Sequence, residues 1–154
     1  MMKIGFFSFT CCEGCTVMFI ELLNKKFFEY VGKVDIQNIR VLRSNEKIGS
    51  LDVAFVEGAI STQSEVKKLN EIREKSKMVV ALGSGAANGY PSNQRNSFDE
   101  ARKKEIMPLI KKLHQLDEIS PISKFIKVDD EINGCPVSED ELAVKMEGYL
   151  KKFT

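Results

Sequence analysis

The sequence lacks tryptophan, has a single histidine and carries a net charge of only +1. Its 23 lysine and arginine residues are balanced by 22 aspartate and glutamate residues. This balance argues against a protein that coats nucleic acid, because neutralising phosphates requires a clustered surplus of positive charge. The longest apolar stretches, at 17–20 and 78–82, are far shorter than the ~20 residues that span a bilayer. The start of the chain also lacks the extended apolar segment of a secretory signal. We therefore expect a cytoplasmic protein with no membrane span and no nucleic-acid partner.

The length of 154 residues suggests one domain over 1–154, since a chain of this size buries roughly 68–70% of its unfolded surface and can form its own core. Short apolar runs alternate with helical stretches, which predicts an α/β fold with a parallel sheet of about five strands and helices on both faces. The expected strands are Lys3–Phe9, Ile36–Leu42, Val53–Val56, Met78–Leu82 and Phe125–Val128.

Four helices are predicted from apolar positions at helical spacing. Pro108 should bend or restart the third helix, and Ser138 with Glu141 should form a capping box for the last. The polar, turn-rich segment Ala86–Asn96 is expected to be an irregular surface loop. The expected helices are about Thr16–Val31, ended by Gly32, then Ser64–Lys75, Phe98–Leu116 and the segment after Ser138.

The four cysteines are unevenly placed. Cys11, Cys12 and Cys15 lie within five residues, and Cys135 is isolated near the other end of the chain. Structural disulfides are uncommon in a reducing cytoplasm, and adjacent cysteines cannot easily bridge one another. The clustered thiols are therefore interpreted as metal ligands or redox groups.

Ligands of open parallel α/β sheets bind outside the carboxyl ends of the strands. The segments that follow four of the predicted strands carry polar or thiol residues, and this edge should bring Cys135 close to the N-terminal cysteines. Four thiolates can hold iron–sulfur or zinc, and a helix N-terminus directly after Cys15 would favour thiolates and an anionic cluster. The segments are 10–15, Glu57–Gly58, Gly83–Gly85 and Gly134–Pro136.

Several alternatives remain open at this point. The cysteines could be ordinary small residues, or a zinc site could use all four without electron transfer. Cys12 and Cys15 also fit a thiol–disulfide oxidoreductase, which leaves Cys11 and Cys135 unexplained. Residues 8–16 are similar to a flavodoxin phosphate loop, although three cysteines there would be unusual for a flavin site. The glycines of 83–89 imitate a dinucleotide loop, but they follow the fourth strand instead of the first.

Four motifs in order resemble a known family: the small subunits of nickel–iron hydrogenases and the 20 kDa, cluster-bearing subunit of NADH:quinone oxidoreductases. The resemblance covers nearly the whole chain and is closest to the short small subunits of cytoplasmic hydrogenases. The motifs are Cys12-Glu13-Gly14-Cys15, Val56-Glu57-Gly58, the run 80–85 (VALGSG) and Asn133-Gly134-Cys135-Pro136.

The resemblance implies a flavodoxin-like domain that carries one proximal 4Fe-4S cluster. Such a subunit docks against a large subunit that holds the catalytic metal site or quinone pocket, and it passes electrons to a further electron-carrier subunit. The catalytic centre of the oxidoreductase would then lie in another chain. Gly58 and Gly85 would line the cluster, and the candidate ligands are Cys11, Cys12, Cys15 and Cys135.

One departure from the family pattern concerns Gly85, which stands where relatives usually supply a cluster cysteine. Cys11 could substitute, since quinone-reductase relatives use two adjacent cysteines in this loop. Alternatively, the other three cysteines hold the cluster with a non-cysteine ligand or as 3Fe-4S. A third explanation is a cluster-free scaffold.

Three further residues are candidates for functional groups. Glu57 ends a predicted buried strand, where a carboxylate is costly unless it is paired, so it is either a proton-relay or partner-contact group or a turn acid satisfied by backbone donors. Glu13, between cluster ligands, could relay protons or be merely exposed. His114 lies on a charged helix and is expected to be a surface residue and not a ligand.

Overall fold

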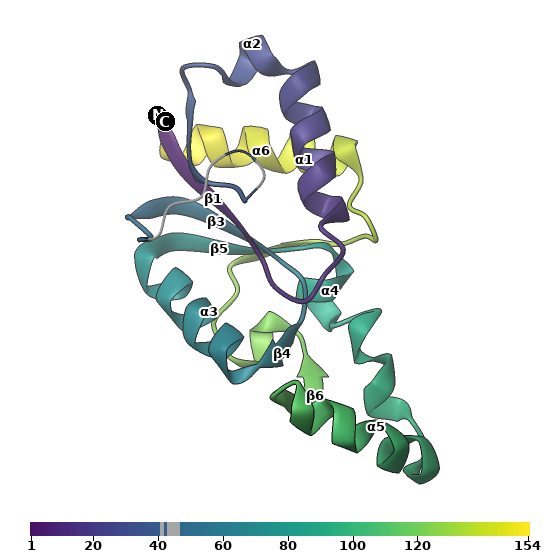
Figure 1. Cartoon of the computed structure of the whole chain (residues 1–154). Coiled ribbons are helices and arrows are strands. Elements are labelled where there is room, and N and C mark those ends of the chain that lie inside the picture. Colours follow the sequence, from purple (N-terminus) through teal and green to yellow (C-terminus); the bar gives the residue numbers. More distant parts are fainter. Residues whose placement is uncertain (41, 43–46) are drawn as a thin grey trace.

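The computed structural model describes residues 1–40, 42 and 47–154. A five-stranded parallel sheet forms its centre, in the order β2-β1-β3-β5-β7 (Figure 1). Counted over these five strands alone, the order is 2-1-3-4-5, which is that of flavodoxin-like folds. The predicted flavodoxin-like sheet with helices on both faces is thus confirmed. The strands are β1 (Met2–Ser8), β2 (Val34–Asn38), β3 (Leu51–Glu57), β5 (Ser76–Leu82) and β7 (Asp130–Ile132).

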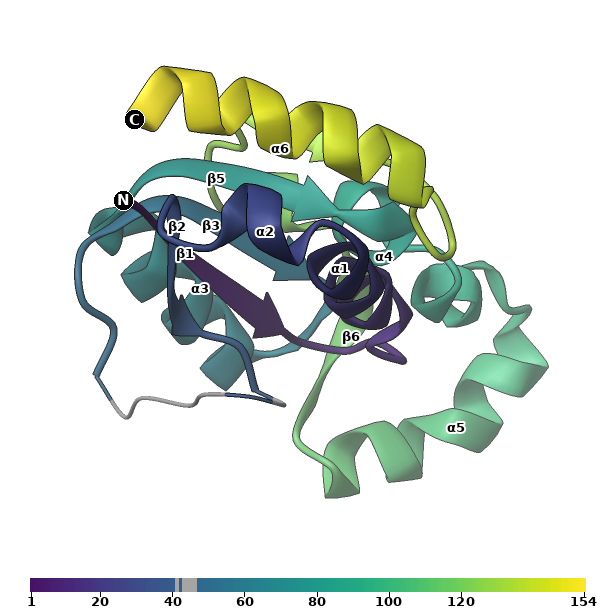
Figure 2. The ribbon, with the colours of Figure 1, turned by 90° about the horizontal axis from the view of Figure 1, so that it is seen from above.

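Helices cover both faces of this sheet (Figures 1 and 2). One face packs against α1 (Gly14–Lys25), α2 (Phe27–Tyr30) and α6 (Glu139–Phe153), and the other against α3 (Gln63–Lys75) and α4 (Gly83–Asn88). Side chains alternate between the two faces along each strand. Phe6 of β1 therefore stacks with Phe19 of α1 and Phe55 of β3, at ring-centroid distances of 4.0 and 4.6 Å, whereas Phe7 joins the opposite core.

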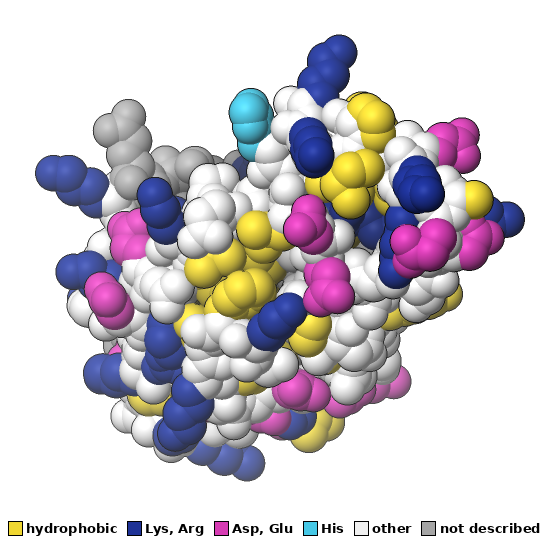
Figure 3. Space-filling view, turned by 90° about the horizontal axis from the view of Figure 1, so that it is seen from below, with side chains coloured by type: hydrophobic (Ala, Val, Ile, Leu, Met, Phe, Trp, Pro, Cys, Tyr) yellow, Lys and Arg dark blue, Asp and Glu magenta, His cyan; other side chains and the backbone are white. Residues whose placement is uncertain are grey.

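A smaller antiparallel sheet lies beside the main one. Strand β4 (Ile60–Thr62) pairs with β6 (Gln115–Ser120). The 3-10 helix η1 (Ser92–Ser97) and helix α5 (Glu100–Lys112) extend from the body of the protein as an arm next to β6 (Figures 1 and 2). On the face seen in Figure 3, basic and acidic side chains are interspersed. Among the described residues, no helix is both long and apolar enough to cross a membrane.

The last strand is tied to α6 through Asp130. Its carboxylate accepts hydrogen bonds from Lys145 Nζ at 2.6 Å and from the Tyr149 hydroxyl at 2.9 Å. Burial by itself would raise the pKa of Asp130, but these bonds and one from the Glu131 N–H hold it below its usual value. The pKa of the Tyr149 hydroxyl is raised, first by burial and then by its bond to this carboxylate.

The sequence-based boundaries were wrong in several places. The apolar run Phe125–Val128 is not a strand, because it follows the 3-10 helix η2 (Ile122–Lys124) and packs into the core on the α3 face. The predicted Ile36–Leu42 strand starts earlier and ends at Asn38, and residue 41 lies outside the described part of the chain.

The helix predictions were also adjusted by the structure. The segment Ala86–Asn96 is largely helical in place of the expected loop, since α4 and η1 occupy most of it. The first predicted helix is divided at Lys26 into α1 and α2, and the third ends at Lys112, with Pro108 inside it. The Ser138 hydroxyl accepts from the Glu141 N–H at 3.4 Å and so caps α6.

Candidate functional site

The carboxyl ends of β1 and β3 meet at the point where the strand order reverses, which is where ligands bind in open α/β sheets. The two chain segments that leave these strands are joined directly: the Thr10 N–H donates to Ala59 O at 3.1 Å, and the Ala59 N–H donates to Thr10 O at 3.0 Å. A cavity of about 470 Å³ opens at this edge, within the range of roughly 300–1,000 Å³ typical of ligand and cofactor pockets. All four cysteines line it.

The structure thus brings together residues that are about 120 positions apart in the sequence. Cys15 is buried at the start of α1, whereas Cys11, Cys12 and Cys135 are exposed. Of the other predicted site residues, Glu57, Gly58 and Gly85 also line the cavity and Glu13 does not. Residues from the loop after β7 and from the turn before η1 complete the lining. The lining is Thr10, Cys11, Cys12, Gly14, Cys15, Glu57, Gly58, Leu82, Ser84, Gly85, Tyr90, Pro91, Ser92, Gly134, Cys135 and Pro136.

Two of the thiols have strongly perturbed acidity. Burial raises the pKa of Cys11 to about 11 and that of Cys15 to about 12, with a further increase from the Glu57 charge. Backbone N–H groups act in the opposite direction: that of Glu13 bonds Cys11, and that of Val137 bonds Cys15. These thiols hold their protons at neutral pH, and binding of a metal would displace the protons.

Two glycines make room for the cysteine loop, and a third packs against the backbone of one of them. Gly83 has φ +81°, and a Cβ there would lie 2.5 Å from Cys15 Sγ. Gly58 has φ +94°, and its Cβ would lie 2.9 Å from Cys11 Cβ. A Cβ on Gly85 would lie 3.1 Å from Gly58 Cα. Gly58 and Gly85 were predicted as site residues individually, whereas Gly83 was predicted only as part of the segment Gly83–Gly85 at this edge of the sheet.

Glu57 is only 4% exposed and serves the start of α1. Its Oε1 accepts from the Cys15 N–H at 3.1 Å, and its Oε2 accepts from the Thr16 N–H at 3.0 Å and the Thr16 hydroxyl at 2.7 Å. A carboxylate is favoured there because the first N–H groups of a helix have no partners within the helix and carry a partial positive charge. The structure therefore shows Glu57 satisfied by backbone donors, and a relay role for it stays a prediction.

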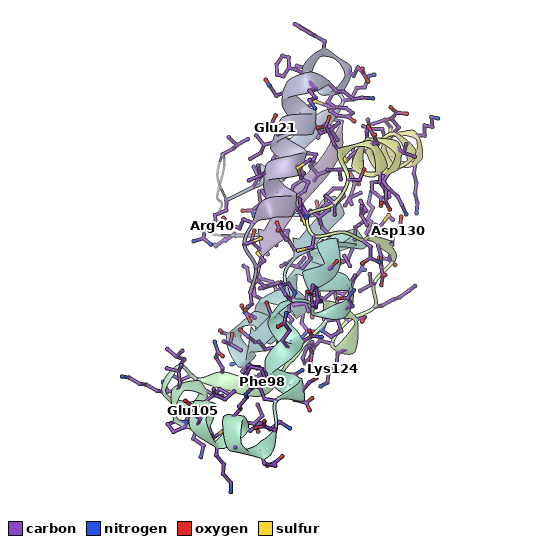
Figure 4. The ribbon with its side chains drawn as sticks, turned by 90° about the vertical axis from the view of Figure 1, so that its right-hand side faces the viewer. Glu21, Arg40, Phe98, Glu105, Lys124 and Asp130 are labelled. Carbon is purple, nitrogen blue, oxygen red and sulfur yellow. The ribbon has the colours of Figure 1, made fainter. Side chains whose placement is uncertain are left out.

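Glu13 and His114 both adopt positive φ values, 61° and 52°. Glu13 directly precedes α1, and its side chain forms an ion pair with Arg40 at 3.3 Å. Because both partners are accessible to solvent, this pair contributes little to stability. Arg40 lies beside one end of α1 in Figure 4, far from Phe98 and Glu105 in the arm. His114 is exposed after α5 and is not among the residues that line the cavity.

The residues of the cavity fit a sulfur-ligated cofactor. No three of the described Cys, His, Asp and Glu side chains are arranged to hold a metal ion in the present geometry. Four thiols nevertheless surround one cavity, and two of them accept backbone N–H bonds. Thiolates are ligands of iron–sulfur clusters and of zinc, so the donor set fits either group.

The fold and the site together define a class of proteins in which a flavodoxin-like sheet carries thiols at its switch point. The family described as the 20 kDa subunit of NADH ubiquinone oxidoreductase matches residues 12–147. The chain belongs to this family.

Named relatives come from hydrogenases. The chain is 28% identical to the delta subunit of sulfhydrogenase 2 from Pyrococcus furiosus, over 92% of this chain and 59% of the relative. It is 32% identical to the gamma subunit of coenzyme F420 hydrogenase from Methanosarcina barkeri, over 90% of this chain and 50% of the relative. The chain thus spans between half and three fifths of the length of these relatives.

The fold is shared with a solved hydrogenase structure. A chain of an NAD⁺-reducing NiFe-hydrogenase in its H₂-reduced state superimposes with a TM-score of 0.84 at 22% identity. The match covers 99% of this chain and 93% of the other. The similarity supports the flavodoxin-like architecture over the full length of the chain.

Proposed function

We propose that this chain is the electron-transfer subunit of a hydrogenase-like oxidoreductase and that it holds one 4Fe-4S cluster. The observation that supports the proposal is the cavity at the switch point of the sheet, which gathers all four cysteines from two distant parts of the sequence. The cluster, when bound, supplies one-electron transfer. The chain's own cysteines would hold it, one of them buried at the start of α1 and three exposed at the mouth of the cavity.

Cys12, Cys15 and Cys135 are three of the proposed ligands, and Cys11 is the fourth. Both Cys11 and Gly85 lie against the backbone of Gly58. The Cβ of a cysteine at position 85 would lie only 3.1 Å from Gly58 Cα. This close contact supports Cys11, in the loop after β1, as the source of the fourth ligand thiol. Three-cysteine ligation, a 3Fe-4S cluster and a cluster-free or zinc-bound scaffold are the competing outcomes.

The partners are proposed from the names of the relatives, which are subunits of hydrogenases. A large subunit would carry the catalytic centre, and a further electron-carrier subunit would exchange electrons with this chain. Glu13 and Glu57 are proposed as proton-relay groups at the boundary with the large subunit. A cytoplasmic location is also part of the proposal.

The proposal is tested by isolating the chain without oxygen, together with any protein that co-purifies with it, and by counting iron and acid-labile sulfide. We expect a brown preparation whose visible absorbance is bleached by dithionite. A yellow preparation that releases flavin, or a colourless one containing zinc or no metal, would contradict the proposal. Nickel and iron counts of a co-purified large subunit test whether the complex is of the hydrogenase type.

A further inference from the structure

A second carboxylate holds the cysteine loop from the opposite face of the sheet. Glu65 lies in the first turn of α3, and its Oε1 accepts a hydrogen bond from the Thr10 hydroxyl at 3.1 Å. Its Oε2 accepts from the N–H groups of Ser61 and Thr62 at 2.7 and 3.0 Å. The hydroxyls of Thr10 and Ser61 also hydrogen-bond to each other at 2.6 Å.

Glu65 accepts more hydrogen bonds than are required to cap α3. A capping box requires only that the glutamate reach back to the N-cap N–H while the N-cap side chain accepts from the glutamate N–H. Thr62 and Glu65 complete that exchange. The bond from Thr10 uses the remaining carboxylate oxygen and connects α3 to a residue 55 positions earlier in the chain. Hydrogen bonds to a charged acceptor are stronger than those between neutral groups.

The connection fixes one end of the loop that carries three cysteines. Thr10 directly precedes Cys11, lines the cavity and is bridged to Ala59 through two backbone bonds. The other end of the loop is fixed by Glu57, which binds the N–H groups of Cys15 and Thr16. Residues 11–14 therefore lie between two fixed points. One is held by the carboxylate of Glu57 in β3 and the other by the carboxylate of Glu65 in α3.

We propose that Glu65 is a positioning residue of the cysteine loop and that it acts through Thr10 to set the place of the Cys11 thiol. The purpose assigned to this device rests on the proposed cluster-carrying function, since a fourth ligand must be held at a defined position to complete the cluster. The anchor itself belongs to the chain and can be measured with or without a cofactor.

The test uses the whole chain and four variants. Thr10→Val removes the hydroxyl at nearly constant shape, Thr10→Ser keeps it, and Glu65→Ala removes the acceptor. Thr62→Ala is the matched control, because it removes the cap of α3 and leaves the Thr10 bond in place. Hydrogen exchange of the amides in 10–16 is followed by mass spectrometry in the chain without cofactor. The electron paramagnetic resonance spectrum of the reduced, reconstituted chain is then compared among the variants.

We expect Thr10→Val and Glu65→Ala to accelerate exchange in 10–16 by about tenfold or more, since a lost bond to a charged group has an effect of that order. Both variants should also alter the resonance spectrum. Thr10→Ser should behave as the unaltered chain, and Thr62→Ala should accelerate exchange only at the start of α3. Should Glu65→Ala fail to fold, Thr10→Val alone decides the outcome.

Three results would overturn the inference: unchanged exchange in Thr10→Val, equal acceleration in Thr62→Ala, or faster exchange with an unchanged cluster spectrum. The failure of the proposed function looks different. If the unaltered chain takes up no iron and sulfide, cluster binding is refuted, and the exchange data still show whether Glu65 anchors the loop.

Discussion

Replacing Glu57 by glutamine should destabilise the chain through the start of α1. The carboxylate accepts three hydrogen bonds within a site that is 4% exposed. Glutamine keeps one side-chain oxygen, which can accept the hydrogen bonds from Thr16. Its NH₂ group then faces the Cys15 N–H, and because both groups are donors, the Cys15 N–H loses its hydrogen bond. A buried donor without a partner costs about 1–3 kcal/mol, and loss of the negative charge at the helix N-terminus costs up to about 2 kcal/mol.

The neutral side chain is cheaper to bury, which offsets part of this loss. We therefore expect a net loss of about 2–3 kcal/mol in the free energy of unfolding. With a slope of about 2 kcal/mol per molar urea, the unfolding midpoint should fall by about 1–1.5 M. Circular dichroism during urea titration of the chain without cofactor measures this shift.

Glu13→Gln is the matched control, because Glu13 flanks the same helix start and, within the described part of the chain, its side chain pairs with the exposed Arg40. Its midpoint should change by the equivalent of at most about 0.5 kcal/mol. The reasoning would be refuted if Glu57→Gln moved the midpoint by no more than Glu13→Gln at an unchanged slope. In that case the buried carboxylate would not support α1.

Three further predictions concern the cluster, the glycine next to it and acid stability. Cys11→Ser should lower the iron content or give a 3Fe-4S signal. An unaffected cluster in Cys11→Ser would exclude Cys11 as a ligand. Gly83→Ala should lower the free energy of unfolding by at least about 1–2 kcal/mol because of its positive φ, and it should impair cluster binding. Gly148→Ala, whose added Cβ meets no atom within 4 Å, should stabilise α6 by about 0.5–1 kcal/mol. Equal melting temperatures for the two variants would contradict this prediction. The pKa of Asp130 is lowered in the folded chain. Its contribution to the free energy of unfolding is therefore complete above the unfolded pKa of about 3.9 and is lost as the pH falls through the folded pKa. Asp130→Asn should lose less stability on acidification than the unaltered chain, as urea titrations across this range will show.

The sequence was sufficient to predict the architecture, because the sheet consists of apolar runs long enough to recognise. β1, β3 and β5 lie close to their predicted positions. The convergence of Cys135 with the N-terminal cysteines was predicted from the parallel arrangement, and it holds because the last strand still ends before Gly134 although it was misplaced. The last strand was misplaced because its apolar neighbour Phe125–Val128 packs against the sheet instead of joining it. Apolar composition shows that a segment is buried but not whether it forms a strand.

The anchors of the site were the least predictable part. Glu57 was recognised as an unusual buried carboxylate, but its partners Cys15 and Thr16 are more than 40 positions away, and no local pattern connects them. Thr62 and Glu65 have the spacing of a capping box, a signal that was readable in the sequence. The bond from Thr10 to Glu65 depends on how β1 and α3 are placed in space, which only the folded structure shows.

The most direct test of the central claim is Mössbauer spectroscopy of the chain reconstituted with isotope-enriched iron in the absence of oxygen. If the four cysteines hold one cubane cluster, nearly all bound iron should appear as a single 4Fe-4S species with tetrahedral sulfur coordination, and the spectrum of Cys11→Ser should differ from it. A spectrum dominated by mononuclear iron, or a chain that retains no iron even together with its partner subunit, would contradict the claim.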